Sequence, residues 1–275
     1  MSISQEKKYF NLKEKVIVVT GATGILGESF VSGLVNMEAR VVLLGRNETV
    51  GEERMNALKE KGGEAIFIKT DVLSRPELER ARDITLNTWG KIDGLVNAAG
   101  GNVPEAVVAP GADVFDLDME ALKRAFDLNL YGTILPTCIF GKAMTQTGRG
   151  SIVNISSMAA QSAITRVLGY SMAKAGIDNY TRWMCVELAQ RYGDAIRINA
   201  IAPGFFVTNQ NRHLLVEKDG YTKRGEAVIR NTPFKRFGNA DELIGTLIWL
   251  LSDASVFVSG EVICVDGGFH IFSGV

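Results

Sequence analysis

The stretch Lys15–Gly27, KVIVVTGATGILG, decides the fold of this chain. Its first half is a β-branched run typical of a buried strand, and a glycine-rich turn follows directly. From Gly24 to Met37 apolar residues recur at helical spacing. Such glycines let the backbone turn tightly and approach a pyrophosphate, while the helix N-terminus supplies N–H groups and positive potential. The stretch therefore predicts a dinucleotide-binding strand–turn–helix unit, the alternative being a tight turn without a ligand.

The same alternation of strand and helix continues along the chain. Further apolar runs predict strands at residues 40–44, 65–69, 94–97, 151–156, 196–201 and 261–265. Helical patterns fill residues 48–61, 76–89, 119–145, 168–191 and 240–251. Strands that are apolar on both faces and alternate with helices form a parallel sheet covered on both sides. We expect an α/β fold: a single doubly wound Rossmann domain over residues 1–275, with a seven-stranded parallel sheet and helices on both faces.

Residues 205–233 are the least regular segment of the chain. They carry many charges, two glycines and few periodic apolar positions. A long irregular segment within a compact domain is often a lid or a substrate-binding loop. We therefore expect residues 205–233 to be a substrate-loop segment within the single domain.

Composition bears on the partners and the compartment of the protein. The 275 residues include 30 basic and 31 acidic side chains, a net charge of −1 that argues against nucleic acid or an anionic membrane as the main partner. The N-terminus is polar, and no apolar run is long enough to cross a bilayer. Three dispersed cysteines predict buried free thiols, and two isolated histidines predict no metal site. We expect a cytoplasmic protein that acts on a small molecule.

The end of the second predicted strand bears on the type of dinucleotide. It reads Leu44-Gly45-Arg46-Asn47, without the carboxylate that would bind the adenosine ribose hydroxyls. Arg46 could instead pair with a 2′-phosphate. The sequence favours NADP over NAD, the alternative being that Arg46 is a solvated surface residue.

Further motifs appear in a fixed order after the glycine turn. Asn97-Ala98-Ala99-Gly100 ends the fourth strand, Ser156-Ser157 ends the fifth, and Tyr170 and Lys174 stand four apart on one helical face. Pro203-Gly204 follows the sixth strand. Together these motifs resemble the classical short-chain dehydrogenase/reductase family, and the resemblance runs from Leu12 to Val265 and beyond. It implies an NAD(P)-dependent oxidoreductase that moves a hydride between the nicotinamide and an alcohol/ketone pair.

The resemblance implies a role for each catalytic residue. Tyr170 is the general acid/base, and Ser157, thirteen residues before it, polarises the substrate carbonyl. Asn129, within Asp127-Leu128-Asn129-Leu130, matches the family's fourth catalytic residue. Lys174 binds the nicotinamide ribose and keeps Tyr170 acidic. The role of Lys174 is physically reasonable. A free tyrosine has a pKa of about 10, and a nearby cation favours the phenolate and so lowers that pKa.

The glycine turn and the resemblance together predict the cofactor contacts. Asp71 stands where the family contacts the adenine, and the turn after Pro203 where it holds the nicotinamide carboxamide. The expected cofactor-binding residues are Gly21, Thr23, Gly24, Ile25, Gly27, Arg46, Asn47, Asp71, Val72, Asn97, Ala98, Gly100, Tyr170, Lys174, Pro203, Gly204, Val207 and Thr208. The chain departs from the classical spacing, since its glycines at 21, 24 and 27 follow the family's extended branch, which leaves the detailed phosphate contacts open.

Several stretches resemble a narrower group, the D-mannonate oxidoreductases or fructuronate reductases. They are residues 97–102 (NAAGGN), 115–118 (FDLD), 203–206 (PGFF), 209–212 (NQNR), 265–269 (VDGGF) and 273–275 (SGV). The polar residues of the predicted loop also suit a sugar acid, whose carboxylate needs cations and whose hydroxyls need amides. The expected substrate contacts are Asn102, Arg166, Asn209 and Arg212.

Other interpretations of the substrate side remain open. The loop arginines could be solvated or make subunit contacts. The chain could reduce a 3-oxoacyl carrier or a polyol-type substrate, or it could be a non-catalytic dinucleotide-binding regulator, against which the intact Ser157, Tyr170 and Lys174 weigh. The resemblance further implies a homotetramer or homodimer, with residues 119–145, 168–191 and the last strand at the interfaces.

Overall fold

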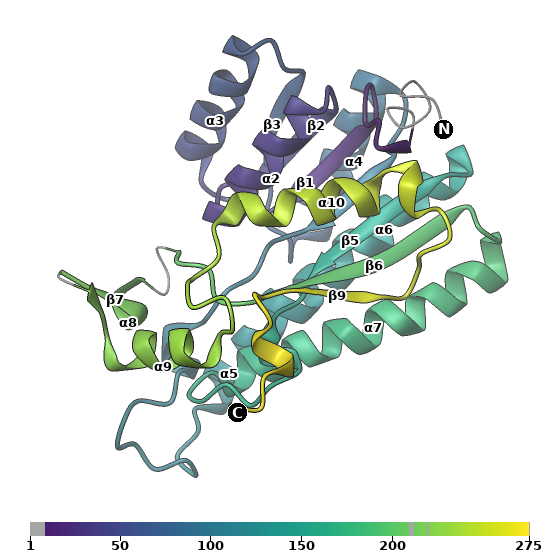
Figure 1. Ribbon diagram of the computed structural model, residues 1–275. Helices are drawn as coiled ribbons and strands as arrows, with labels where there is room; N and C mark the ends of the chain where they lie inside the picture. The colour runs from purple at the N-terminus through teal and green to yellow at the C-terminus, as the bar shows by residue number, and fades with distance from the viewer. Residues whose placement is uncertain (1–8, 209–211, 219, 275) are drawn as a thin grey trace.

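The computed structural model describes residues 9–208, 212–218 and 220–274. Within them, seven parallel strands form one sheet in the order β3-β2-β1-β4-β5-β6-β9 (Figure 1). The strands are β1 (Val16–Thr20), β2 (Arg40–Gly45), β3 (Ala65–Lys69), β4 (Gly94–Asn97), β5 (Gly150–Ile155), β6 (Ile196–Pro203) and β9 (Val262–Val265). The strand order reverses between β1 and β4, and in such sheets ligands bind at the carboxyl ends of the strands beside that switch point.

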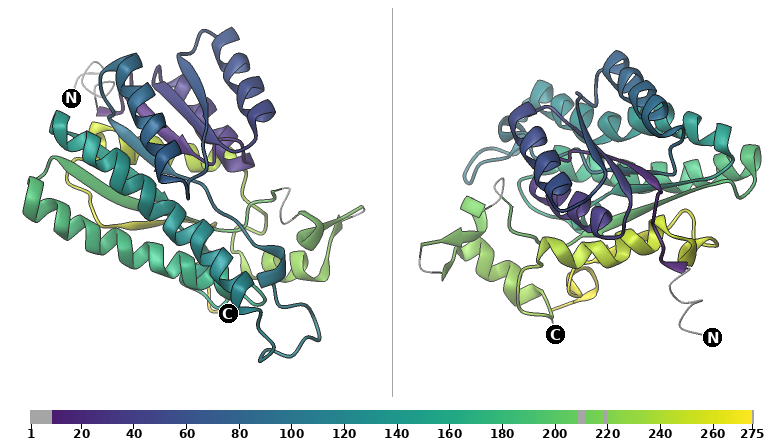
Figure 2. Two further views of the ribbon diagram at one scale, coloured as in Figure 1. Left: turned by 180° about the vertical axis from the view of Figure 1, so that it is seen from behind. Right: turned by 90° about the horizontal axis from the view of Figure 1, so that it is seen from above.

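Helices cover both faces of the sheet, which confirms the predicted doubly wound fold. The helices are α2 (Ile25–Asn36), α3 (Glu48–Glu60), α4 (Arg75–Trp89), α5 (Met119–Phe126), α6 (Gly132–Thr147), α7 (Leu168–Tyr192) and α10 (Ile244–Leu251). Helices α2, α3 and α10 pack on one face, and α4, α6 and α7 on the other (Figures 1 and 2).

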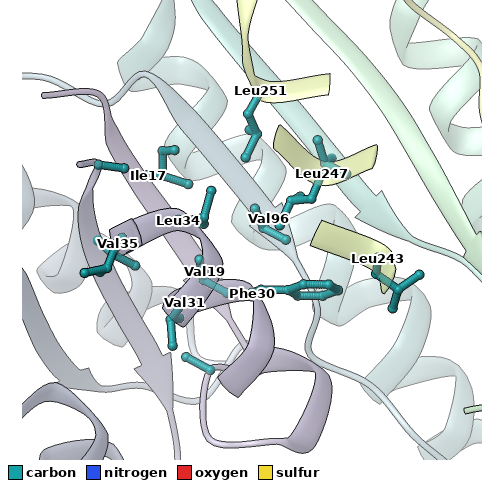
Figure 3. Packing of buried hydrophobic residues seen from close by; sticks show 14 of the residues in the cluster. Ile17, Val19, Phe30, Val31, Leu34, Val35, Val96, Leu243, Leu247 and Leu251 are labelled. Atoms are coloured by element: carbon teal, nitrogen blue, oxygen red, sulfur yellow. The ribbon is translucent and has the colours of Figure 1, made fainter. Parts of the chain in front are cut away.

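Two apolar clusters, one on each side of the sheet, form the core. Alternate residues of β1 point to opposite faces, so Ile17 and Val19 enter one cluster and Val16 and Val18 the other. Phe30 of α2 is fully buried between β1 and α10 (Figure 3). This two-sided burial explains why the strands are apolar throughout.

The predicted helix at residues 119–145 is not continuous. Helix α5 passes through a π-helical turn, Asp127–Tyr131, into α6. Asn129 lies in this turn and is fully buried. Its side chain holds the backbone of Gly101 on both sides, with the Gly101 N–H donating to Oδ1 and Nδ2 donating to the Gly101 carbonyl, each over 2.9 Å. The turn therefore marks a place where the helix is tied to a loop from a distant part of the sequence.

The segment at residues 205–233, expected to be irregular, contains regular structure. It holds α8 (Arg212–Leu215), a hairpin of β7 (Val216–Glu217) and β8 (Gly220–Tyr221), and α9 (Lys223–Asn231). The Thr222 side chain caps α9 by accepting a hydrogen bond from the Gly225 N–H. The segment projects beside the carboxyl ends of the strands (Figure 1). Phe206 bridges to Gly238 in parallel, so the chain just after the segment comes back beside its start.

Two smaller expectations need correction or qualification. The cysteines are free, but Cys138 is exposed and Cys185 and Cys264 are only half-buried, so buried thiols are the wrong description. The predicted helix at 240–251 begins as a 3-10 turn, Ala240–Leu243, before α10. In the described ranges no helix combines the length and apolar character needed to cross a membrane, and no three metal-binding side chains gather there.

Candidate active site

A cleft of about 670 Å³ opens at the carboxyl ends of the strands, beside the switch point between β1 and β4. It runs from the glycine turn after β1 to the residues that follow β6. Of the residues predicted from the sequence, those lining it are Gly21, Thr23, Gly24, Ile25, Gly27, Arg46, Asn47, Asp71, Val72, Ala98, Gly100, Asn102, Ser157, Tyr170, Lys174, Pro203, Gly204 and Thr208. Five others, Asn97, Asn129, Arg166, Val207 and Arg212, do not line it. Asn209 lies outside the described residues, as do its neighbours at positions 210 and 211.

The glycine turn is packed so closely that side chains are excluded. Gly21 has a positive φ of 65°, and a Cβ there would lie 2.7 Å from the Ala98 carbonyl oxygen. A Cβ on Gly27 would lie 2.2 Å from the Gly21 carbonyl oxygen. The turn thus presents bare backbone and the N-terminus of α2 to the cleft, which is the surface a pyrophosphate needs.

Arg54 of α3 braces this turn, a role that the sequence did not indicate. Its guanidinium donates to the carbonyl oxygens of Ala22 and Gly24, over 2.6 and 2.7 Å, and to Glu28 of α2 over 2.7 Å. Arg54 also lines the cleft. In a helix crowded with charges, nothing in the sequence separates this arginine from a solvated one.

The residues at the adenosine end of the cleft have distinct local tasks. Asn47 caps α3, because its side chain accepts a hydrogen bond from the Val50 N–H. The Asp71 carboxylate accepts from the Leu73 N–H. Arg46 is exposed at the cleft edge, so its cation is accessible to an anionic group there.

Asn97 is a structural residue of the sheet. Its side chain is buried and donates to Thr137 and to Asn154 over 2.8 and 2.9 Å. The cleft wall is formed by the next residues along the chain, Ala98, Ala99 and Gly100. The expectation that Asn97 lines the cofactor is therefore not met by its side chain.

Three consecutive residues at the end of β5 meet helix α7. The Lys174 Nζ donates to the Ile155 carbonyl oxygen over 2.6 Å and lies 5.5 Å from the centre of the Tyr170 ring. The Ser157 hydroxyl is hydrogen-bonded to Tyr170, and it also accepts from the Ala159 N–H. The predicted serine, tyrosine and lysine are thus brought together in the cleft.

Burial shifts the pKa values of Tyr170 and Lys174 in opposite directions. It raises the pKa of Tyr170, an effect that the hydrogen bond from Ser157 opposes. It lowers the pKa of Lys174 to about 8, against the opposing charge of Asp178. Tyr170 is therefore held protonated in the protein alone, and a lower pKa requires positive charge beside its hydroxyl.

Asn129 acts through the backbone instead of lining the cleft. By holding Gly101 it fixes the loop that carries Gly100. A Cβ at Gly100 would lie 2.7 Å from Asn129 Oδ1 and 3.3 Å from Lys174 Nζ. The π-helical turn, Gly100 and the lysine are therefore packed against one another, with no room for a larger residue at position 100.

The substrate end of the cleft differs from the sequence prediction. Asn102 lines it, and its buried Oδ1 has no hydrogen-bond partner among the described residues. Arg212 is exposed on α8, Arg166 is half-buried, and neither lines the cleft. The cation in the wall is Arg224 of α9, which donates to the side-chain and backbone oxygens of Thr165 over 3.1 and 3.2 Å. Apolar side chains complete this end: Ile164, Val167, Phe205, Phe206, Leu214 and Leu215.

Arg166 and Arg224 form a pair of like charges. Burial, and after it the charge of Arg166, lowers the pKa of Arg224. Arg166 has a positive φ of 76°, a conformation that costs energy in a residue with a side chain. Among the described residues no carboxylate forms an ion pair with either arginine. The substrate end therefore carries positive charge that an anion would balance.

Comparisons with known proteins agree with this geometry. A family model described as Enoyl-(Acyl carrier protein) reductase matches residues 21–270. The Bacillus subtilis (strain 168) protein named Uncharacterized oxidoreductase UxuB is 40% identical over 275 residues, covering 96% of this chain and 98% of the relative.

Two solved structures have nearly the same fold. A Haemophilus influenza protein described as a “putative D-Mannonate oxidoreductase”, with bound NAD, has a TM-score of 0.88 and 38% identity, covering 96% of this chain and 98% of that one. A gluconate 5-dehydrogenase from Burkholderia cenocepacia J2315, in complex with NADP and tartrate, has a TM-score of 0.86 and 29% identity, covering 96% and 98%.

Proposed function

This chain belongs to the short-chain dehydrogenase/reductase family and is an NAD(P)-dependent oxidoreductase, and we propose that it interconverts a keto-sugar acid and its alcohol, of the D-fructuronate/D-mannonate type. One observation carries the substrate class: Arg224 lies in the wall of the cleft beside the like charge of Arg166, and no carboxylate of the described residues forms an ion pair with it. A guanidinium in such a position suits a carboxylate, with which it forms charge-assisted hydrogen bonds.

The residues of the cleft have complementary parts in the reaction. The reduced nicotinamide, when bound, supplies the hydride that the carbonyl carbon receives. Tyr170 gives its proton to the carbonyl oxygen, acting as general acid. Ser157 donates a hydrogen bond to the same oxygen as negative charge develops on it. Lys174 holds positive charge close to Tyr170 and favours the phenolate that remains. Asn129 acts from a distance, by holding the loop of Gly100 and Gly101 against Lys174.

The related proteins support a sugar-acid substrate. The Haemophilus protein is described as an oxidoreductase of D-mannonate and the Burkholderia protein as a dehydrogenase of gluconate. Both names refer to acids derived from sugars. Asn102, with a buried Oδ1 that has no partner among the described residues, would accept a hydrogen bond from a substrate hydroxyl.

A second candidate function follows from the apolar part of the wall. Phe205, Leu214 and Leu215 would favour a less polar ketone, such as a 3-oxoacyl chain. A polyol reductase would need neither the arginine nor the apolar residues. Both alternatives predict activity that does not depend on Arg224.

For the cofactor we favour NADP over NAD. Arg46 at the edge of the cleft supports this choice, because an accessible arginine pairs with a 2′-phosphate. Related structures contain NAD in one case and NADP in the other, so the family accommodates both.

We further propose a homotetramer or homodimer in the cytoplasm. Exposed apolar residues on the π-helical turn and α7 support association, among them Tyr131, Met172, Trp183 and Val186, with Trp183 58% exposed. Analytical ultracentrifugation tests the assembly, and a monomer at micromolar concentration would contradict it.

Initial rates test the proposed reaction. Purified protein should oxidise NADPH in the presence of D-fructuronate, and the neutral ketose D-fructose serves as the matched substrate without a carboxylate. We expect a kcat/KM for fructuronate above about 10⁴ M⁻¹s⁻¹, the lower end of ordinary enzymes, and a much smaller value for fructose. Equal kcat/KM values for fructuronate and fructose would contradict the proposed recognition of the carboxylate.

A further inference from the structure

Helix α7 presents three side chains to the end of β5 at intervals of four residues. Tyr170 is hydrogen-bonded to Ser157, Lys174 to the carbonyl of Ile155, and the Asp178 carboxylate accepts a hydrogen bond from Ser156. Residues 155, 156 and 157 are consecutive, so each takes one partner from a different turn of the helix. The first two contacts belong to the reaction proposed above, and the third has no assigned role.

Asp178 is a buried acid with few ways to satisfy its charge. It is 5% exposed. Burial raises the pKa of its carboxyl, while the hydrogen bonds from Ser156 and Gln161 and the charges of Arg182 and Lys174 lower it. From β9, the thiol of Cys264 contacts the other side of Gln161, with Sγ 3.3 Å from Oε1, and Asp266 lies near that thiol. A buried carboxylate persists only where hydrogen bonds and cations compensate it.

Among these groups, Lys174 gives Asp178 a link to catalysis. The negative charge of Asp178 acts on Lys174 through space and raises its pKa against the effect of burial. Lys174 is 4% exposed, so solvent does little to stabilise its cation. A charge one helical turn away therefore matters more here than it would at the surface.

We propose that Asp178 is a positioning residue that keeps Lys174 protonated and, through Ser156, holds Ser157 in register with Tyr170. The proposal rests on the roles of Tyr170 and Lys174 stated above. Without the carboxylate, a smaller fraction of Lys174 is protonated near neutral pH. Tyr170 then loses the cation that favours its phenolate, so it ionises at higher pH.

The test is a pH titration of Tyr170 in the NADP⁺-bound enzyme, read from the near-ultraviolet absorption of tyrosinate as the difference between each protein and its Tyr170→Phe counterpart. Asp178→Asn keeps the size of the side chain and an oxygen that accepts from Ser156, but removes the charge. We expect the Tyr170 midpoint to rise by about one pH unit, the lower end of the effect of a neighbouring charge. Asp178→Glu, which restores the charge, should return the midpoint towards the wild-type value.

Two control variants separate charge from structure. Ser156→Ala removes the hydrogen bond but keeps the carboxylate, so the midpoint should move less than in Asp178→Asn. Asp194→Asn removes an exposed acidic charge just after α7 and should not move it. An unchanged midpoint in a folded Asp178→Asn protein would overturn the proposal, even if activity fell, because a purely structural role changes rates without changing this ionisation.

Should Asp178→Asn fail to fold, the double variant Asp178→Ala with Ser156→Ala removes both partners of the bond and leaves neither unsatisfied. The same rise in midpoint is expected there, and its absence counts equally against the proposal. The titration needs no substrate. A protein that shows the shift but does not oxidise D-mannonate would contradict the sugar-acid assignment alone, whereas the reverse result would contradict only the role of Asp178.

Discussion

The Lys174 ammonium group lies 2.6 Å from the carbonyl oxygen of Ile155, the last residue of β5. This contact joins the N-terminal third of α7 to the carboxyl end of β5, where both line the cleft. Because Ile155 belongs to a rigid strand, the cation is held in one place instead of moving on a flexible side chain. The position of the positive charge in the cleft is therefore set by the sheet, while burial lowers the pKa of Lys174 and the charge of Asp178 raises it.

Replacing Tyr170 by Phe should abolish turnover while leaving the cofactor bound. The hydroxyl is the proton donor of the proposed reaction, and general acid catalysis contributes about 10²- to 10⁴-fold. Steady-state kcat should fall by that factor, and the dissociation constant of NADPH, measured by fluorescence titration, should change less than about threefold. Tyr192→Phe, on the exposed end of α7, is the matched control. Near-normal kcat in Tyr170→Phe would refute the assignment.

Replacing Arg46 by Ala should raise the KM for NADPH and leave the KM for NADH unchanged. The loss of one charged hydrogen bond to a phosphate costs about 1.5–3 kcal/mol, or about 10- to 100-fold. The wild-type protein should also have a lower KM for NADPH than for NADH. Equal wild-type KM values would show that Arg46 does not select the 2′-phosphate, and reversed values would show that the enzyme prefers NAD.

Replacing Arg224 by Ala should lower kcat/KM for a sugar acid by about 10- to 100-fold, since the charged hydrogen bonds to the carboxylate are lost. The rate with a neutral ketone should change little. Arg212→Ala is the matched control, because Arg212 is exposed and does not line the cleft. If Arg212→Ala had the larger effect, the carboxylate would bind to α8 instead of α9.

Gly27→Ala should destabilise the protein and weaken cofactor binding. Its Cβ would lie 2.2 Å from the Gly21 carbonyl oxygen, so the turn must shift, at a cost of about 1–3 kcal/mol typical of overpacking. Gly245→Ala, in the exposed part of α10 with no atom near its Cβ, should instead stabilise by about 0.5–1 kcal/mol. Urea denaturation of both variants measures the difference, and equal unfolding free energies would contradict it.

The stability of the cofactor-free protein should rise with pH above 8 because of Lys174. Its pKa is about 8 in the folded protein and 10.5 when unperturbed. Between these values the unfolded chain binds more protons at this site, so the free energy of unfolding increases with pH. Below pH 8 both states carry the proton and the site contributes no slope. The measurement is urea unfolding at several pH values against Lys174→Met, whose curve should lack this rise; parallel curves would contradict the lowered pKa.

Much of the fold could be predicted from the sequence because burial on both faces leaves little freedom. Each strand is a short apolar run that ends at, or just before, a glycine or a polar residue, and the seven runs match the seven strands to within about two residues. The glycine turn was equally readable, since its spacing reflects backbone contacts as close as that of Gly27 with Gly21. These features depend on neighbours in the sequence or on burial alone.

The features that were missed depend on contacts between distant residues. The π-helical turn is held by Asn129 bonding to Gly101, 28 residues earlier. Arg54 reaches back to a turn about 30 residues before it. Helix α9 is short and has few apolar residues, so its pattern did not stand out. The sequence pointed to Arg166 and Arg212 for the substrate, whereas Arg224 is the loop arginine that lines the cleft.

The bridge between Phe206 and Gly238 has a consequence for how such an enzyme can diversify. The Gly238 N–H donates to the Phe205 carbonyl over 2.9 Å, so the chain that leaves β6 comes back beside the same point before it continues into α10. The segment between these two residues can vary in length and sequence, because its anchor points stay the same distance apart whatever it contains. A relative with a different segment here would keep the tyrosine of the proposed reaction and accept another ketone. Grafting residues 207–237 between such relatives should therefore transfer substrate preference, while the sheet and the glycine turn stay unchanged.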